Sequence, residues 1–115
     1  MKVLARKEVQ AALAADLVFK ALADSGRRRL LDRLRMHGGQ TLNMLCEGML
    51  MTRQAVAKHL AQLEEADLVV IAWQGREKLH YLNPVPIHEI AQRWIQPFER
   101  HRLEALDDIK KSLED

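Results

Sequence analysis

The chain has 115 residues, of which 48% are hydrophobic, 18 are basic and 16 are acidic. This length suits one domain over residues 1–115, and the net charge of +2 favours an anionic partner only weakly. One cysteine excludes an internal disulfide, no apolar run is long enough to span a membrane, and the first residues lack the unbroken apolar centre of a secretory signal. We therefore expect a cytoplasmic protein without a membrane partner.

A first helix is predicted over residues 8–23, and its apolar side chains point in nearly every direction. Val9, Leu13 and Leu17 belong to this set, and alanines fill the gaps between them. A helix of this kind has to be buried on more than one side. In so short a chain a second subunit is the simplest source of that burial.

Three further helices are predicted before the first β-branched run. They span 25–37, with Asp24 or Ser25 as N-cap, then 41–49, and then a segment that starts after Thr52 and ends at "ADLVV". Leucines, Met49 and Val56 recur in them at helical spacing. Their expected inner faces are Leu30, Leu31 and Leu34; Leu42, Leu45 and Met49; and Val56, Leu60 and Leu63.

A β-hairpin is predicted next. The segments "VVIAW" at 69–73 and "KLHYL" at 78–82 are typical of strands, and "QGRE" between them is a turn in which Gly75 adopts the unusual dihedral angles. A last, long helix follows Asn83, Pro84 and Pro86. Its apolar stripe includes Trp94, Phe98 and Leu106, and Pro97 within the stripe is expected to kink the helix or to break it in two.

This order of elements predicts a mainly helical fold with a small β-hairpin wing, a winged helix-turn-helix. On a helical wheel the fourth helix turns Gln54, Lys58 and Ala61 outward, and Thr52 and Arg53 lie at its start. Arginine can pair bidentately with guanine, and glutamine with adenine, in the major groove of DNA. These side chains are therefore candidates for reading double-stranded DNA, although a solvated helix face remains the alternative for this segment alone.

Two other basic segments support the same reading. Arg76 and Lys78 stand at the tip of the hairpin, where they could reach the DNA backbone or the minor groove. In "GRRRLLDRLR" at 26–35, Arg28 and Arg29 are expected outside the core. Each segment alone could be a solvated surface, but the three together on one winged scaffold favour DNA binding. His59, by contrast, lies near the apolar arc and is expected to be a packed structural residue.

The segments "FKALADSGRRRLLDRL", "TRQAVAKHLAQLEEADLV" and "WQGREKLHYLNP" give the chain a resemblance to the ArsR/SmtB family of winged-helix repressors over residues of about 16–83. Ser25 and Gly26 depart from the family's usual Pro-Thr type of pair. The resemblance implies a homodimer through the first and last helices, a two-fold operator, and release upon a signal. It assigns DNA binding to Thr52, Arg53, Gln54, Lys58, Arg76 and Lys78. The interface candidates are Val9, Leu13, Leu17, Trp94, Phe98 and Leu106.

Many members of that family sense metals, and two metal sites are conceivable in this sequence. The positions of the family's paired cysteines fall on Thr41 and Asn43, and Cys46 lies alone further along. On the last helix His101 and Glu104 have a suitable spacing, but the expected upstream Asp-x-His is missing. We therefore expect no metal and no cofactor, with a zinc-responsive repressor of non-standard site as an alternative. Any redox role of Cys46 is left open.

The last segment, "AQRWIQPFERHRLEALDDIKKSLED", resembles a metal-independent subgroup of the family, although Pro97 is unusual there. The leading hypothesis is thus a sequence-specific repressor that acts as a homodimer. A winged-helix protein-interaction module without DNA readout is the alternative from another class. An enzyme is not expected, because no glycine-rich phosphate loop or catalytic triad pattern is present. The operator, the inducer and the regulated genes are left open.

Overall fold

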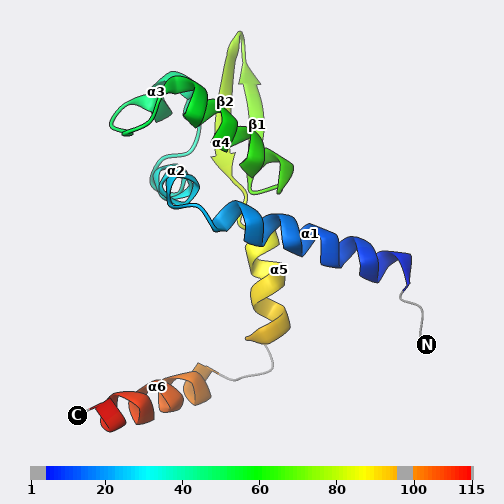
Figure 1. Ribbon diagram of the computed structural model, residues 1–115, viewed down its shortest axis with the longest axis vertical. Helices are drawn as coiled ribbons and strands as arrows, with labels where there is room; N and C mark the ends of the chain where they lie inside the picture. Colours follow the sequence, from blue (N-terminus) through cyan, green and yellow to red (C-terminus); the bar gives the residue numbers. More distant parts are fainter. Residues whose placement is uncertain (1–4, 96–99, 115) are drawn as a thin grey trace.

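The computed structural model describes residues 5–95 and 100–114, and Figure 1 shows how its elements are arranged. In chain order they are α1 (Arg6–Leu22), α2 (Ser25–Met36), α3 (Leu42–Cys46), α4 (Arg53–Glu65), β1 (Val69–Gln74), β2 (Glu77–Leu82), α5 (Val85–Trp94) and α6 (Arg100–Glu114). Four helices, an antiparallel hairpin and a helical C-terminal part were predicted, and this order is confirmed.

The core lies where the C-terminal half of α1 meets α2, α3, α4 and the start of β1. Its members are the leucines, valines and alanines that recur at helical spacing, and they are fully or almost fully shielded from solvent. They are Val18, Ala21, Leu30, Leu31, Leu34, Leu45, Val56, Leu60, Leu63, Ala66, Leu68 and Val69. The inner faces predicted for α2 and α4 are therefore confirmed.

Side-chain caps begin α2, α3 and α4. Asp24, Thr41 and Thr52 each accept a hydrogen bond from the backbone N–H three residues ahead, at 3.1 to 3.2 Å. Of the two candidates for α2, Asp24 is thus the N-cap. The hydrogen bond from the Arg27 amide is the main cause that lowers the pKa of Asp24 below its ordinary value.

The third helix is shorter than predicted. It ends at Cys46, whereas the sequence suggested 41–49, and the prediction was wrong at this end. Gly48 has a φ of 77°, which a continuing right-handed helix does not allow. The guanidinium of Arg33 closes the end instead, donating to the carbonyl oxygens of Met44, Leu45 and Glu47 at 2.8, 2.7 and 2.5 Å.

The hairpin has the predicted strands, each one residue longer at the turn. Gln74 pairs with Glu77, which leaves a two-residue turn whose Gly75 has a φ of 62°. An isolated bridge joins Gln40 to His80 and fastens the hairpin to the segment before α3. His80 is buried, and its Nδ1 lies 2.8 Å from the carbonyl oxygen of Gln40.

Arg27 fastens the end of α1 to α4. Its guanidinium donates to the carbonyl oxygens of Ala21 at 2.7 Å and Lys20 at 3.0 Å, and to Oε1 of Gln62 at 2.5 Å. It also lies 3.3 Å from Nδ1 of His59, which is half-buried and structural, as predicted. Arg27 therefore belongs to the packing of the fold and not to the exposed basic surface.

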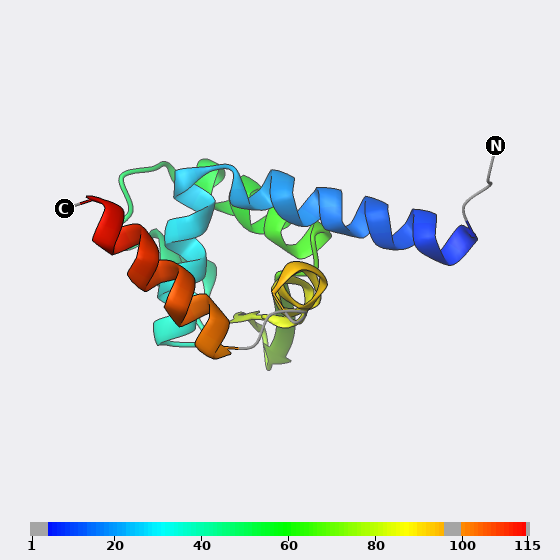
Figure 2. The ribbon, with the colours of Figure 1, turned by 90° about the horizontal axis from the view of Figure 1, so that it is seen from below.

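The structure describes two helices in the C-terminal part, and the kink or break predicted at Pro97 lies outside the described residues. α5 ends at Trp94 and α6 begins at Arg100, while Pro97 and Phe98 lie outside the described residues. No residue of α5 or α6 is buried. Seen from below, the N-terminal half of α1 also projects away from the other helices (Figure 2). Within the described ranges no helix has the length and hydropathy that crossing a membrane requires.

The Arg27 contacts generate a stability prediction. Arg27→Met keeps most of the side-chain volume but removes the donors to two helix-end carbonyls and to Gln62. We expect the free energy of unfolding to fall by about 2 kcal/mol, because these partners lose their hydrogen bonds in a partly buried place. Denaturant unfolding followed by circular dichroism measures the change. The control is Arg35→Met on the exposed side of α2, and equal losses in both variants would contradict a special role for Arg27.

Candidate nucleic-acid interface

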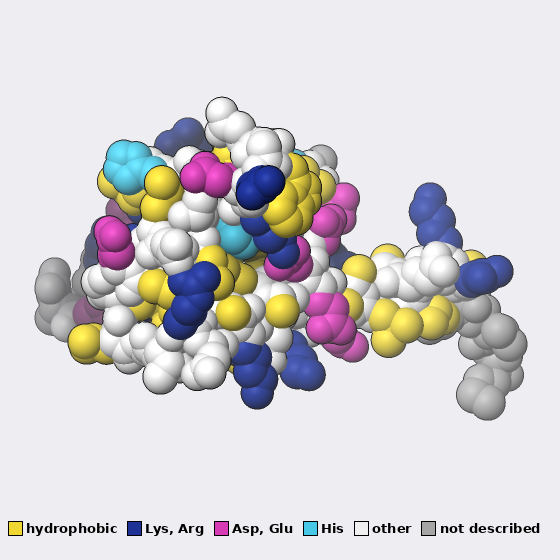
Figure 3. Space-filling view, turned by 90° about the horizontal axis from the view of Figure 1, so that it is seen from above, with side chains coloured by type: hydrophobic (Ala, Val, Ile, Leu, Met, Phe, Trp, Pro, Cys, Tyr) yellow, Lys and Arg dark blue, Asp and Glu magenta, His cyan; other side chains and the backbone are white. Residues whose placement is uncertain are grey.

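One side of the molecule carries both the start of α4 and the hairpin turn. Figure 3 views this side, toward which the hairpin points in Figure 1, and shows Lys and Arg side chains among hydrophobic and a few acidic ones. Thr52, Arg53, Gln54 and Lys58 are exposed on α4, and Arg76 is exposed in the turn. Gln54 and Lys58, which the helical wheel turned outward, are thus exposed as predicted, and all five side chains are accessible to a partner.

The orientation of α4 follows from its buried side. Val56, Leu60 and Leu63 are 0, 3 and 0% exposed, so the helix cannot rotate about its axis without exposing them. Gln54 and Lys58, four residues apart, share the opposite face. The intervening position on that side is Ala57, whose small side chain allows a surface to approach the helix closely.

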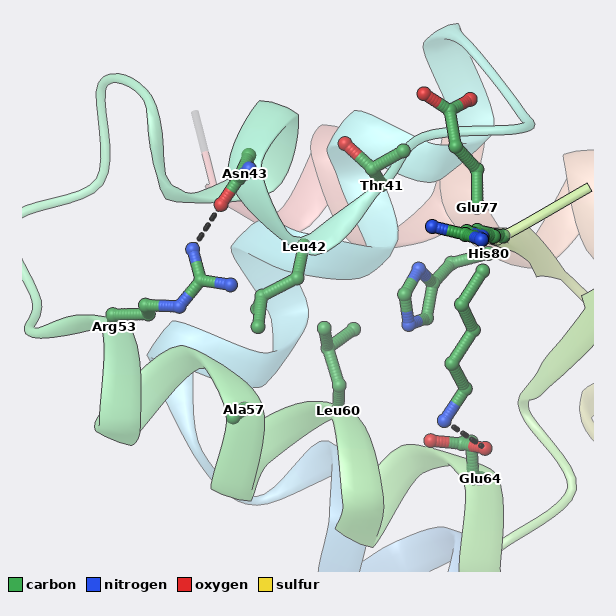
Figure 4. A pocket seen from close by; sticks show the side chains of 11 residues that line it. Thr41, Leu42, Asn43, Arg53, Ala57, Leu60, Glu64, Glu77 and His80 are labelled. Carbon is green, nitrogen blue, oxygen red and sulfur yellow. Dashed lines mark hydrogen bonds and ion pairs between the residues drawn. The ribbon is translucent and has the colours of Figure 1, made fainter.

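A groove of about 410 Å³ lies between α3, α4 and the hairpin (Figure 4). Arg53 at one end of it donates a hydrogen bond to Oδ1 of Asn43 in α3. At the other end Nζ of Lys78 lies 3.5 Å from Oε1 of Glu64 in α4. The side chains lining the groove are those of Thr41, Leu42, Asn43, Arg53, Ala57, Leu60, Glu64, Arg76, Glu77, Lys78 and His80.

Two features of this groove were missed by the reasoning from sequence. Glu64 and Glu77 bring negative charge next to the basic residues, and Lys78 is half-buried instead of standing free at the tip. The period of two along a strand was the available signal, because it places Lys78 on the same side as the buried His80. The charge pairing with Glu64 required the packing of α4 against β2 and could not be read from spacing.

The arginines of α2 are placed differently from those of α4 and the turn. Arg28 and Arg29 are both exposed, as expected, but neither lines the groove. Nη1 of Arg28 donates to the carbonyl oxygen of Leu22 at 2.6 Å, so this guanidinium caps the end of α1. The structure thus assembles α4 and the hairpin on one side and leaves the α2 arginines outside that assembly.

Large apolar side chains are also exposed on α1 and on the last two helices. On α1, Val9 and Leu13 are 41 and 59% exposed, and on the last two helices Trp94 and Leu106 are 53 and 57% exposed. Leu17 is instead half-buried against the core. Phe98, the remaining interface candidate, lies outside the described residues. This much exposed hydrophobic surface is typical of a site that a partner covers.

The candidate metal ligands do not lie together in the described part of the structure. Within residues 5–95 and 100–114, no three His, Cys, Asp or Glu side chains are grouped as a metal ion would need. Thr41 caps α3, and Asn43 is bonded to Arg53. Cys46 is a half-buried free thiol, and Glu104 lies 3.5 Å from Arg100.

The known proteins that resemble this chain are helix-turn-helix transcriptional regulators. Residues 22–71 match the family model described as a helix-turn-helix domain. An uncharacterized helix-turn-helix-type transcriptional regulator of Bacillus subtilis, YuzN, is 38% identical over 87 residues, which cover 70% of this chain and 95% of that protein. An ArsR-like transcriptional regulator from Rhodococcus sp. RHA1 is 28% identical with a TM-score of 0.69, covering 87% of this chain and 95% of its own.

The fold is also found in other solved structures. One is the winged helix-turn-helix domain of Mb0332 from Mycobacterium bovis, with 17% identity, a TM-score of 0.64 and coverage of 88% of this chain and 99% of its own.

The fold is that of a winged helix-turn-helix, and the family match and the relatives are those of DNA-binding transcriptional regulators. With these relatives, the chain belongs to the ArsR family of helix-turn-helix transcriptional regulators.

The acidic side of the groove generates a prediction about affinity. Glu64→Gln removes a negative charge and releases Lys78, so we expect DNA to bind about two- to fivefold more tightly at low salt. Fluorescence anisotropy with a labelled duplex measures this change. Glu65→Gln is the matched control, since Glu65 is exposed and does not line the groove. An equal gain in both variants would show that net charge alone is responsible.

Proposed function

We propose that this protein is a transcriptional repressor that binds a two-fold operator as a homodimer, in the cytoplasm and without catalytic activity. The observation that carries the proposal is the placement of Arg53, Gln54 and Lys58, exposed on a helix whose opposite side is locked in the core. A cationic and amide-bearing helix face of this kind fits the donor and acceptor pattern of the major groove.

Each part of the interface has its own role in this proposal. Gln54 and Arg53 read base edges, Lys58 binds phosphate or guanine, and Thr52 caps α4 so that its N-terminus faces the DNA. Arg76 and Lys78 bind the backbone or the minor groove beside the major-groove contacts. Arg28 and Arg29 lie away from the groove, and we assign them at most long-range attraction of the polyanion.

The exposed apolar side chains of α1 and the last helices support the dimer. Val9 and Leu13 of α1 and Leu106 of α6 are more than one-third exposed in one chain, and burial against a second copy would remove them from water. The M. bovis protein with this fold is described as homodimeric. Pairing through α1 and the last helices would separate the two α4 helices by about one turn of DNA, on the order of 34 Å.

Control by a metal ion is not part of the proposal. Thr41 and Asn43 stand where metal-sensing relatives are expected to carry cysteines, and here both side chains are engaged in hydrogen bonds within the fold. This supports placement in a metal-independent subgroup. A DNA-selection assay with and without zinc tests the point, and a zinc-dependent change in affinity would favour the alternative of a non-standard zinc site.

Two variants distinguish base reading by Gln54 from backbone binding by Arg76. Gln54→Ala should relax the choice of sequence at the base that it contacts, because a bidentate pair contributes about 1–3 kcal/mol of discrimination. Arg76→Ala should weaken selected and scrambled duplexes alike and reduce the salt dependence of binding. Anisotropy titrations on a duplex selected from a random pool, at several salt concentrations, measure both effects.

If Arg76→Ala relaxes the sequence choice and Gln54→Ala weakens all duplexes alike, base reading belongs to the hairpin instead of α4. If the wild-type protein binds no duplex in this assay, the DNA-reading role of this surface fails and the protein-interaction module is favoured.

The dimer is tested by a charge placed on its expected interface. Leu13→Glu should shift the protein from dimer to monomer, because an unpaired carboxylate cannot be buried at low cost. Analytical ultracentrifugation measures the mass. The control is Leu50→Glu in the turn before α4, a leucine that is 94% exposed and lies on another segment of the fold. A dimer that persists in Leu13→Glu, or a monomer in the control, would contradict the assignment.

A further inference from the structure

Trp73 stands out among the side chains of the hairpin. It is 67% exposed, although it is one of only two tryptophans in the sequence and has the largest apolar surface of any residue type. The other large hydrophobic residues that the hairpin exposes, Val70 and Tyr81, are 42 and 37% exposed. Keeping an indole in water is unfavourable, so its position relative to the proposed interface is informative.

The strand register places Trp73 close to the turn and on the side of α4. It pairs with Lys78 and comes two residues before Gly75. Because side chains alternate along strands, Trp73 shares a face of the hairpin with Ile71 on its own strand and with Lys78 and His80 on the other. That face is turned toward α4, since Lys78 reaches Glu64 there.

Trp73 therefore lies next to the cationic side chains of the hairpin. Its cross-strand neighbour is Lys78, and Arg76 follows in the turn. In Figure 3 large hydrophobic and basic side chains are adjacent on this face of the molecule. Cations beside an exposed aromatic ring favour a partner that is both anionic and rich in apolar edges. Duplex DNA has this combination, with phosphates flanking the sugar walls of its minor groove.

We propose that Trp73 is a third DNA contact of the hairpin, which packs its indole against the deoxyribose wall of the minor groove beside Arg76. The inference rests on the proposed function, and it adds a contact that differs in kind from those of Arg76 and Lys78. Those two act through charge and release counterions, whereas the indole acts by removing apolar surface from water. Its contribution is therefore independent of salt.

Salt dependence separates the two kinds of contact. Trp73→Ala should weaken binding to a duplex selected from a random pool by about tenfold, a modest loss for an interface tryptophan, because the hairpin lies beside the central contacts of α4. The slope of log affinity against log salt should stay unchanged, whereas Arg76→Ala should reduce it by about one per protomer. Val70→Ala is the matched control, because it shortens an exposed apolar side chain on the opposite face of the same strand. It should bind DNA like the wild type.

Fluorescence provides an independent readout. The difference between the spectra of the wild type and Trp73→Phe isolates the emission of Trp73 from that of Trp94. Adding the selected duplex should protect this emission from quenching by acrylamide, and Trp73→Phe should retain part of the affinity because a ring remains. Thermal unfolding of all variants establishes that the fold is kept.

The outcomes distinguish this inference from the function on which it rests. If Trp73→Ala binds like the wild type while Arg76→Ala is weakened, the contact of Trp73 with DNA is overturned and the DNA-binding function stands. A Trp73→Ala variant with a reduced salt slope would overturn the apolar mechanism. If the wild type binds no duplex at all, both proposals are overturned together.

Discussion

The burial of one side of α4 is the constraint on which the rest of the molecule depends. Val56, Leu60 and Leu63 lose almost all of their solvent exposure, and each is worth roughly 1.5–3 kcal/mol when fully buried. Rotating the helix would forfeit this energy, so the polar side chains between these residues are held outward. A packed core thus presents Gln54 and Lys58 in a defined orientation before any partner arrives.

Local patterns predicted most of the fold. Capping side chains, glycine in the hairpin turn and the spacing of leucines are signals within a few residues, and they placed α2, α4 and the strands closely. The end of α3 was misplaced although Gly48, just after it, was a local signal for a helix end, and the closing contact of Arg33 from a different helix could not be read from spacing. The kink or break expected at Pro97 falls outside the described residues, between α5 and α6.

The candidate site was predicted less completely than the fold. A helical wheel was sufficient to show that Arg53, Gln54 and Lys58 are exposed. Tertiary contacts decided the rest: Arg28 caps α1, Lys78 pairs with Glu64, and Arg27 is withdrawn into the packing of the fold. A cluster of arginines in a sequence therefore suggests more basic surface than the fold exposes, because a guanidinium can donate to carbonyl oxygens at helix ends as well as to phosphates.

The Arg27 contacts link two surfaces with separate tasks. One guanidinium donates to the carbonyl oxygens of Ala21 and Lys20 near the end of α1, the helix with exposed apolar side chains, and to Gln62 of α4, the helix proposed to read DNA. The three hydrogen bonds are 2.5 to 3.0 Å long, so a tilt of α1 must either move α4 with it or break these hydrogen bonds. In the proposed dimer, a shift of α1 on subunit pairing would therefore reach α4, the proposed DNA-reading helix, through Arg27 as well as through the core packed between the two helices.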